Sequence, residues 1–271
     1  MKDEKANTAD NLKTPDNNFL SGTLPSYVPF STVVNTILVG DAEAKLQTLE
    51  SETVHLVFTS PPYNVGVDYD IYNDTLPFNE YLDKLNKIFT ECVRVLVKGG
   101  HLLIQIANTG RQPYTPLTDY ITTMLADKID MRGEIIWDKQ NMTSATAWGS
   151  WLSANKPSLR DTHEYILVFR KEGGDRVGES DITKEEFMEY TKAIWKVTPE
   201  TSDVGHPAPF PKSLVARAIK LYSFKGETVL DPFNGSGTTC EVAKKLGRNF
   251  IGIDISKRYC NLAEDRINIL L

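Results

Sequence analysis

The stretch DPFNGSGTT, residues 231–239, decides the fold of this chain, because it joins an apolar strand to a helix through two glycines. Gly235 and Gly237 let the backbone turn tightly and approach a ligand closely. The helix that begins near Thr238 presents free N–H groups, which suit a carboxylate or a phosphate. The pattern predicts a strand–loop–helix unit that binds a nucleoside.

The strand that follows, NFIGID, ends in Asp254, 17 positions beyond Gly237. An acidic residue at the tip of the second strand of such a unit is placed to bind ribose hydroxyls. A Gly-x-Gly pair alone would indicate no more than a structural turn. With the strand, the helix and the acidic residue all present, nucleoside binding is the stronger interpretation.

A second motif, TSPPYN at residues 59–64, also comes directly after an apolar strand. The adjacent prolines Pro61 and Pro62 fix the backbone and donate no hydrogen bonds, so their carbonyls can face a ligand. The Ser60 hydroxyl and the Pro61 carbonyl could hold an amino group, while Tyr63 stacks on an extruded base. The alternative is a Pro-Pro turn with a core-packing tyrosine.

Alternating strands and helices along the rest of the chain predict a doubly wound α/β sheet. We expect an amphipathic helix at 77–96, stopped by Gly99-Gly100, and a short helical insertion, TKEEFMEYTKAIW, at 183–195. The length of 271 residues suits one domain with a small insertion. The absence of an apolar run long enough to span a bilayer argues against a membrane protein.

The formal net charge of −6 counts mildly against a nucleic-acid partner, but phosphate contacts depend on local charge. Residues 139–171 carry five basic and two acidic side chains, whereas residues 172–200 carry four basic and eight acidic ones. Most of the acidic residues of these two segments therefore lie outside residues 139–171, the stretch that we expect to face DNA. Three cysteines form no paired framework and no Cys-x-x-Cys site, which favours a reducing cytoplasm.

The two motifs together resemble those of the amino-group DNA methyltransferases, with SPPY at 60–63 and FNGSG at 233–237. Further similarity lies in GDA at 40–42, HPAPFP at 206–211 and RNFIGIDISKRY at 248–259. The order, with the SPPY motif first and the cofactor loop last, resembles the beta subgroup. The resemblance implies a Rossmann-like, circularly permuted fold that binds S-adenosylmethionine. It implies a mostly parallel seven-stranded sheet with an antiparallel edge hairpin.

The resemblance also implies a domain organisation and a set of site residues. We expect a flexible arm at 1–30, a catalytic half at 31–171, an insertion for target recognition at 172–200 and a cofactor-binding half at 201–271. The catalytic residues expected are Ser60, Pro61, Pro62 and Tyr63. The cofactor-binding residues expected are Asp41, Phe210, Lys212, Asp231, Phe233, Asn234, Gly235, Ser236, Gly237, Thr238, Thr239 and Asp254.

Some of these residues have a competing structural interpretation. Asp41 could cap the helix that follows it, and Lys212 could be a solvated helix lysine. No metal is expected, because His163 and His206 have no second ligand at suitable spacing. The DNA-gripping residues expected are Arg111, Lys139, Trp148, Trp151, Lys156 and Arg160, although the tryptophans could instead pack in the core.

Since the first position of the tetrapeptide is serine, the resemblance favours N4 of cytosine in double-stranded DNA as the methyl acceptor. An N6-adenine enzyme is the alternative within the family, and a catalytically silent DNA-binding module is the alternative from another class. None of the three cysteines stands beside proline, which argues against a C5-cytosine enzyme. We expect a monomer or homodimer with a cognate restriction endonuclease as its partner.

Overall fold

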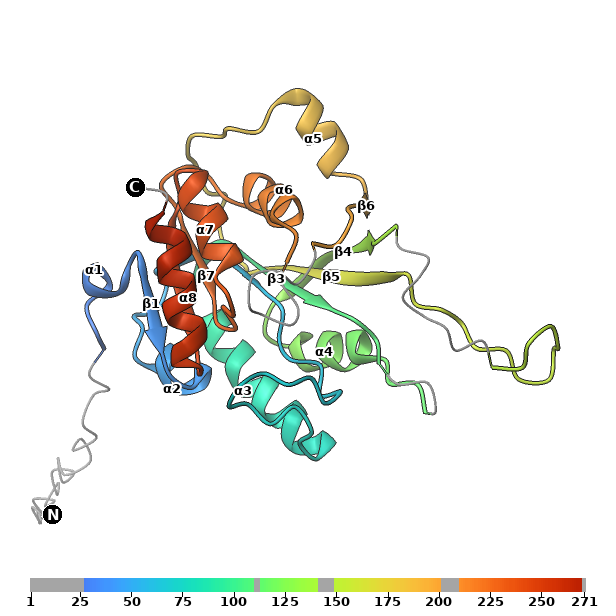
Figure 1. Cartoon of the computed structure of the whole chain (residues 1–271). Coiled ribbons are helices and arrows are strands. Elements are labelled where there is room, and N and C mark those ends of the chain that lie inside the picture. Colours follow the sequence, from blue (N-terminus) through green and yellow to red (C-terminus); the bar gives the residue numbers. More distant parts are fainter. Residues whose placement is uncertain (1–26, 110–112, 141–148, 201–209, 270–271) are drawn as a thin grey trace, which may run out of the picture.

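The computed structural model describes residues 27–109, 113–140, 149–200 and 210–269 (Figure 1). Its strands are β1 (Thr36–Val39), β2 (Val54–Thr59), β3 (Leu96–Ile106), β4 (Asp130–Asp138), β5 (His163–Arg170), β6 (Ile194–Lys196), β7 (Thr228–Asp231) and β8 (Asn249–Asp254). Its helices are α1 (Phe30–Val33), α2 (Ala42–Gln47), α3 (Phe78–Val95), α4 (Leu117–Leu125), α5 (Lys184–Tyr190), α6 (Lys212–Tyr222), α7 (Thr238–Lys245) and α8 (Lys257–Asn268).

The strands form one sheet in the order β1-β8-β7-β2-β3-β5-β4-β6. Every neighbouring pair is parallel except β3·β5 and β4·β5, so β5 alone runs against the others. The expected parallel sheet with an antiparallel hairpin is therefore confirmed. The expected number of strands was too low by one, because the short β6 pairs with β4 outside the hairpin.

Helices cover both faces of the sheet and bury two separate apolar clusters (Figure 1). On one face α2, α3 and α4 pack, and on the other α6, α7 and α8. The amphipathic pattern of α3 explains its position, since Tyr81, Leu85, Ile88 and Phe89 are buried at helical spacing. Because β2 and β7 are parallel neighbours, their carboxyl ends lie together at one end of the sheet.

The strands β2 and β7 are neighbours, as the two motifs required, with Leu56 opposite Val229 and Val57 opposite Leu230. Beyond the last paired residues the Thr59 hydroxyl donates a 2.6 Å hydrogen bond to the Asp231 carboxylate. This bond joins the start of one motif to the start of the other. Ligand sites of such sheets lie at this edge.

Several boundaries differ from those expected. The last residues of the predicted arm belong to the fold, because Val28 forms a bridge to Leu49 and Phe30 begins α1; residues 1–26 lie outside the described residues. The glycines at 99–100 do not stop α3, which ends at Val95 and continues directly into β3. Gly99 has a φ of 75°, and a Cβ on it would lie 2.5 Å from the Gly174 carbonyl oxygen, so the close approach of the turn at Gly174 requires a glycine here.

The first part of the segment 172–200 is tied to the edge of the sheet opposite the two motifs. Arg176 pairs with Glu227, just before β7, and donates to the carbonyl of Gly99 near the start of β3. Asp181 pairs with Arg248, just before β8, at 2.6 Å. The insertion helix is shorter than expected, because residues 194–196 form β6. This placement argues against base reading by residues 172–190.

Within the described ranges, no helix has both the length and the apolar character needed to cross a membrane.

Candidate active site

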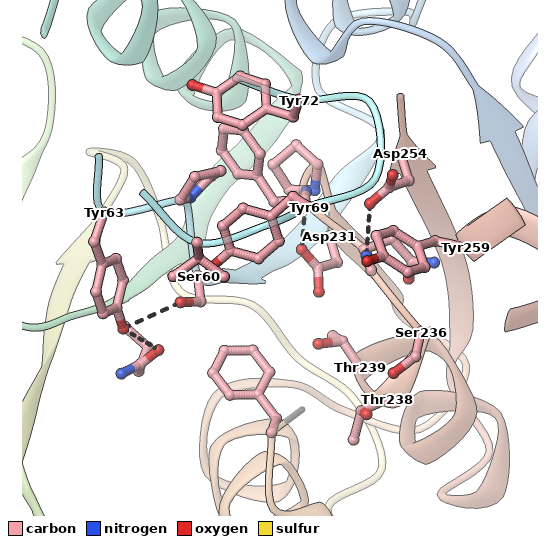
Figure 2. Close-up of a pocket in the computed structure, with 18 of the residues that line it drawn as sticks. Ser60, Tyr63, Tyr69, Tyr72, Asp231, Ser236, Thr238, Thr239, Asp254 and Tyr259 are labelled. Atoms are coloured by element: carbon pink, nitrogen blue, oxygen red, sulfur yellow. Dashed lines mark hydrogen bonds between the residues drawn. The ribbon is translucent and has the colours of Figure 1, made fainter. Parts of the chain in front are cut away.

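A cavity of about 420 Å³ lies where β2 and β7 end, and residues of both motifs line it (Figure 2). Ser60 and Tyr63 lie on one side of it, and Asp254, Tyr259 and Ser236 lie on the other. From the expected set, the cavity is lined by Asp41, Ser60, Pro62, Tyr63, Lys139, Phe210, Asp231, Phe233, Asn234, Gly235, Ser236, Thr238, Thr239 and Asp254.

The loop after β7 is folded around the carboxylate at the tip of β8. The backbone N–H of Gly235 donates to one oxygen of Asp254 at 2.8 Å, and the N–H of Ser256 donates to the other at 2.8 Å. Gly235 has a φ of 48°, in the left-handed region that glycine adopts readily. Burial raises the pKa of Asp254, and the two backbone hydrogen bonds oppose that rise.

Gly237 has a role different from the one expected. It does not line the cavity, and a Cβ on it would lie 2.5 Å from the Cβ of Ala263 in α8. The glycine therefore permits α7 and α8 to pack closely behind the loop. Close helix packing, rather than approach to a ligand, explains this position.

One buried polar atom in the cavity wall, the Asn234 side-chain nitrogen, has no hydrogen-bond partner among the described residues. Buried polar groups without partners are uncommon in folded proteins and are typical of ligand-binding sites. An amide nitrogen can donate to the carboxylate or hydroxyls of an amino-acid nucleoside such as S-adenosylmethionine. The residues present therefore fit this cofactor.

Behind the cofactor loop, Glu241 forms ion pairs with three cationic side chains. It pairs with Arg266 and Lys245, and with Lys212 at 2.7 Å, while Arg266 also donates to the Ser236 carbonyl at 2.8 Å. Burial alone would raise the pKa of Glu241, but these cations outweigh it and lower the pKa to about 2. Lys212 was expected at the cofactor. It does not line the cavity and instead supports this network.

Asp41 combines both interpretations offered for it. Its carboxylate accepts from the N–H of Ala44 at 3.3 Å and so caps α2, and it also lines the cavity. A 3.1 Å ion pair with Lys84 outweighs partial burial and lowers the pKa of Asp41. On the other side of the cavity, the ring of Phe210 stacks on Phe58 at 5.3 Å.

The SPPY motif is connected by hydrogen bonds to strands β3 and β5. The Ser60 hydroxyl donates to the Tyr63 hydroxyl at 3.3 Å, and Tyr63 donates to the Gln105 side-chain oxygen at 2.9 Å (Figure 2). The amide nitrogen of Gln105 in turn donates to Glu164. Burial, and then the charge of Glu164, raises the pKa of Tyr63, so the phenol stays protonated. Pro61 is buried and does not line the cavity.

Residues 54–265 match the N6/N4 family of DNA methylases. The chain belongs to this family. A type II methyltransferase of Methanocaldococcus jannaschii, M.MjaVI, is 38% identical over 165 residues, which cover 58% of this chain and 85% of the relative. The DNA adenine methyltransferase YhdJ of Escherichia coli K12 is 30% identical over 258 residues, covering 89% and 85% of the two chains.

A candidate DNA modification methylase of Thermus thermophilus, solved with S-adenosyl-L-methionine, is similar in structure. Its TM-score is 0.71 at 31% identity, and the match covers 87% of this chain and 94% of the other. This chain is accordingly an S-adenosylmethionine-dependent DNA methyltransferase of the amino-group family, and its fold is the Rossmann-like methyltransferase fold.

The residues expected to grip DNA separate into two groups in this methyltransferase. Lys139 lines the cavity and forms an ion pair with Glu164. It therefore does not lie on the outer surface with the other basic residues of the DNA-facing stretch. Lys156 and Arg160 are exposed, and Trp151 is 63% exposed rather than packed in the core. All three lie in the segment 149–162, which projects from the sheet before β5 (Figure 1). Arg111 and Trp148 lie outside the described residues.

Sequence reasoning missed several residues of the site. The buried Asp74 accepts from the backbone N–H groups of residues 64–67, at 2.9–3.1 Å, and so fixes the loop that follows Tyr63. From the same loop Tyr69 and Tyr72 reach the cavity. No periodic pattern marks these residues, since the loop has no regular secondary structure. Gln105 did leave a signal, as a polar residue within the apolar run LLIQIA.

Proposed function

We propose that this methyltransferase transfers a methyl group to N4 of cytosine, in a base that has left the stack of duplex DNA. The observation that carries the proposal is the hydroxyl of Ser60 on the cavity wall, opposite the cofactor side. Family resemblance associates serine at this position with cytosine, and a carboxylate or an amide with adenine. The SPPY-before-FNGSG order supports placement in the beta subgroup.

The bound S-adenosylmethionine supplies an electrophilic methyl group, and the residues of the chain prepare the acceptor. The Ser60 hydroxyl accepts a hydrogen bond from an amino proton, which favours a tetrahedral nitrogen and stabilises the charge that develops on it. Tyr63 stacks on the base. The buried position of both reactants holds them in contact and excludes water.

No covalent intermediate with the enzyme is needed. Cys92, Cys240 and Cys260 are all buried, and burial raises the pKa of each thiol, that of Cys260 to about 12. None of them is therefore an available thiolate nucleophile. Their burial supports direct transfer to an exocyclic amine over a C5-cytosine mechanism.

For the cofactor, we propose that Phe233 packs on the adenine, Asp254 binds the ribose and Asp41 lies near the adenine amino group. Thr238 and Thr239 would donate to the methionine carboxylate. The position of both threonines in the cavity wall, at the start of α7, supports the last assignment. All five residues line the same cavity.

N6 of adenine is the second candidate acceptor, because YhdJ, a relative that matches most of the chain, is named as an adenine methyltransferase. A catalytically silent DNA-binding module is opposed by the intact cavity. A cognate restriction endonuclease, a cytoplasmic location and a monomeric or homodimeric state also stay proposals. The type II naming of M.MjaVI supports the first of these.

Sequencing of modified bases in DNA from cells that express the chain tests the acceptor and locates the target site. We expect N4-methylcytosine at one short sequence, absent from cells that express a Tyr63→Ala variant. Modification confined to adenine would assign the enzyme to the alternative. Unmodified DNA from cells that contain the soluble, cofactor-binding protein would favour the silent module.

A further inference from the structure

The base side of the cavity contains an ion pair that the mechanism above does not use. Lys139 follows directly after β4, and Glu164 is the second residue of β5. The two side chains form an ion pair, and both line the cavity. Their side chains are 27% and 14% exposed, so the pair is largely removed from solvent.

Within this pair Glu164 already has three hydrogen-bonding neighbours in the protein. One carboxylate oxygen accepts from Lys139, and the other accepts from Gln105 and lies 3.4 Å from the Tyr63 hydroxyl. Three of the roughly four lone-pair positions of the carboxylate are then occupied by protein donors. Glu164 is therefore an anchor that holds its neighbours in place.

Lys139 has donors to spare. An ammonium carries three N–H groups, and Glu164 is its hydrogen-bond partner among the described residues. The ring of Trp137 lies on another side, 5.1 Å from the ammonium nitrogen. Of the described residues that line the cavity, the other lysine is Lys84, which is paired with Asp41. Lys139 thus supplies a cationic donor in the cavity wall, joined to Tyr63 through Glu164 and Gln105.

We propose that Lys139 is a specificity-determining residue that donates to the acceptor edge of the extruded base. The inference rests on the proposed function. Flipped bases are read by hydrogen bonds to the Watson–Crick edge. In cytosine, the acceptors N3 and O2 follow one another beside the amino group, whereas in adenine N1 is followed by a C–H group. Since N3 of cytosine and N1 of adenine are equivalent acceptors, the Lys139 ammonium favours cytosine through O2, which has no counterpart in adenine.

A phosphate of the DNA backbone is the competing partner for an ammonium. The position of Lys139 argues against it, because the side chain lies inside the cavity and its charge is already balanced by Glu164. A phosphate contact would also be blind to the identity of the base. A contact from Lys139 to the base would therefore make the rate depend on which base is flipped, whereas a contact to phosphate would not.

The test is a cycle of two enzymes and three substrates. Duplexes with the mapped target site carry cytosine, 3-deazacytosine, which lacks N3, or an aminopyridine C-nucleoside, which keeps the amino group and the ring nitrogen beside it but lacks O2, and kcat/KM is measured for each. The wild type should prefer cytosine over the analogue that lacks O2 by roughly 5- to 150-fold more than Lys139→Met does, since a good base contact discriminates by about 1–3 kcal/mol. Intrinsic differences in amine reactivity cancel in this comparison.

Lys139→Arg should recover part of the discrimination, and cofactor affinity measured by calorimetry should be unchanged in both variants. A Lys139→Met/Glu164→Gln double variant removes both charges and shows whether any loss comes from an unpaired Glu164. Equal discrimination in wild type and Lys139→Met would overturn the inference while leaving the proposed function intact. So would weaker binding of an abasic duplex with a shallower salt dependence, which marks a phosphate contact. Failure of the wild type on cytosine itself would overturn the proposed function, and this inference with it.

Discussion

At the scale of single residues, Tyr63 joins the two halves of the acceptor site. Its hydroxyl is held by Gln105 and Ser60, and its ring lines the cavity. Hydrogen bonds at the hydroxyl fix the plane of the ring, which leaves one rigid surface for a base. Position and stacking are thus functions of different atoms of the same side chain and can be separated by substitution.

Replacing Tyr63 with alanine should keep S-adenosylmethionine affinity but lower kcat/KM on duplex DNA by roughly 5- to 150-fold, since base–aromatic stacking contributes about 1–3 kcal/mol. Tyr63→Phe is the matched control, because it keeps the ring and loses only the hydroxyl; it should retain most of the activity. Calorimetry and initial rates on the three proteins check the prediction. Wild-type rates in Tyr63→Ala would exclude the stacking role.

Asp231 predicts a pH dependence of stability. Burial raises its pKa from 3.8 to about 6, against the opposing hydrogen bonds from Thr59, Thr239 and the Phe233 N–H. The folded state then binds the proton more tightly than the unfolded state, so this group stabilises the fold most below pH 4. That contribution, about 3 kcal/mol, is lost as the pH rises through 6.

Urea unfolding of the cofactor-free protein between pH 4 and 7.5 measures this effect. The free energy of unfolding of the wild type should fall more steeply with rising pH than that of Asp231→Asn, which keeps the acceptor oxygen but cannot ionise. Parallel curves for the two proteins would show that the carboxyl does not titrate in this range.

At the scale of elements, the packing of α7 against α8 depends on Gly237. Its φ of 83° and its contact with Ala263 both oppose a side chain. Gly247 also has a positive φ, 71°, but open space beyond it. Gly237→Ala should therefore combine backbone strain of about 1–2 kcal/mol with an overpacking cost of about 1–3 kcal/mol.

In thermal or urea unfolding, Gly247→Ala should show the strain alone, while Gly237→Ala loses more stability and also binds S-adenosylmethionine more weakly. Equal losses in the two variants would mean that α8 yields to the added methyl group.

The elements also show how far the sequence could predict the site. The cofactor loop and SPPY were predictable because each follows an apolar strand, and strand ends meet at one edge. The sequence did not predict Glu164 as a site residue, since it lies at the start of a strand and site residues were expected at strand ends. Because β5 is antiparallel, that start lies beside the ends of the others. Strand direction, together with loop contacts such as those of Asp74, requires tertiary structure.

At the scale of the whole molecule, charge is distributed unevenly about the sheet. The acidic segment 172–190 lies at the edge away from the cavity, and the projecting segment 149–162 carries Lys156 and Arg160 on the other side of β5. A DNA duplex that delivers a base to the cavity would meet the second segment and not the first. The net charge of −6 is then compatible with DNA binding.

The variant Lys156→Gln/Arg160→Gln should bind DNA of any sequence more weakly, and the slope of log affinity against log salt should become shallower by about 2. Lys98→Gln is the matched control, because Lys98 is exposed near the start of β3 at the opposite edge of the sheet. Anisotropy titrations over a range of salt concentrations measure both slopes. A shallower slope in Lys98→Gln alone would contradict this placement, because it would put the DNA at the edge of the sheet where β3 starts.

We propose that the product of the whole enzyme is N4-methylcytosine. The most direct measurement is mass spectrometry of nucleosides from duplex DNA incubated with the purified protein and S-adenosylmethionine, with Tyr63→Ala as the matched control. We expect N4-methylcytosine with the wild type and far less with the variant. N6-methyladenine without N4-methylcytosine would contradict it.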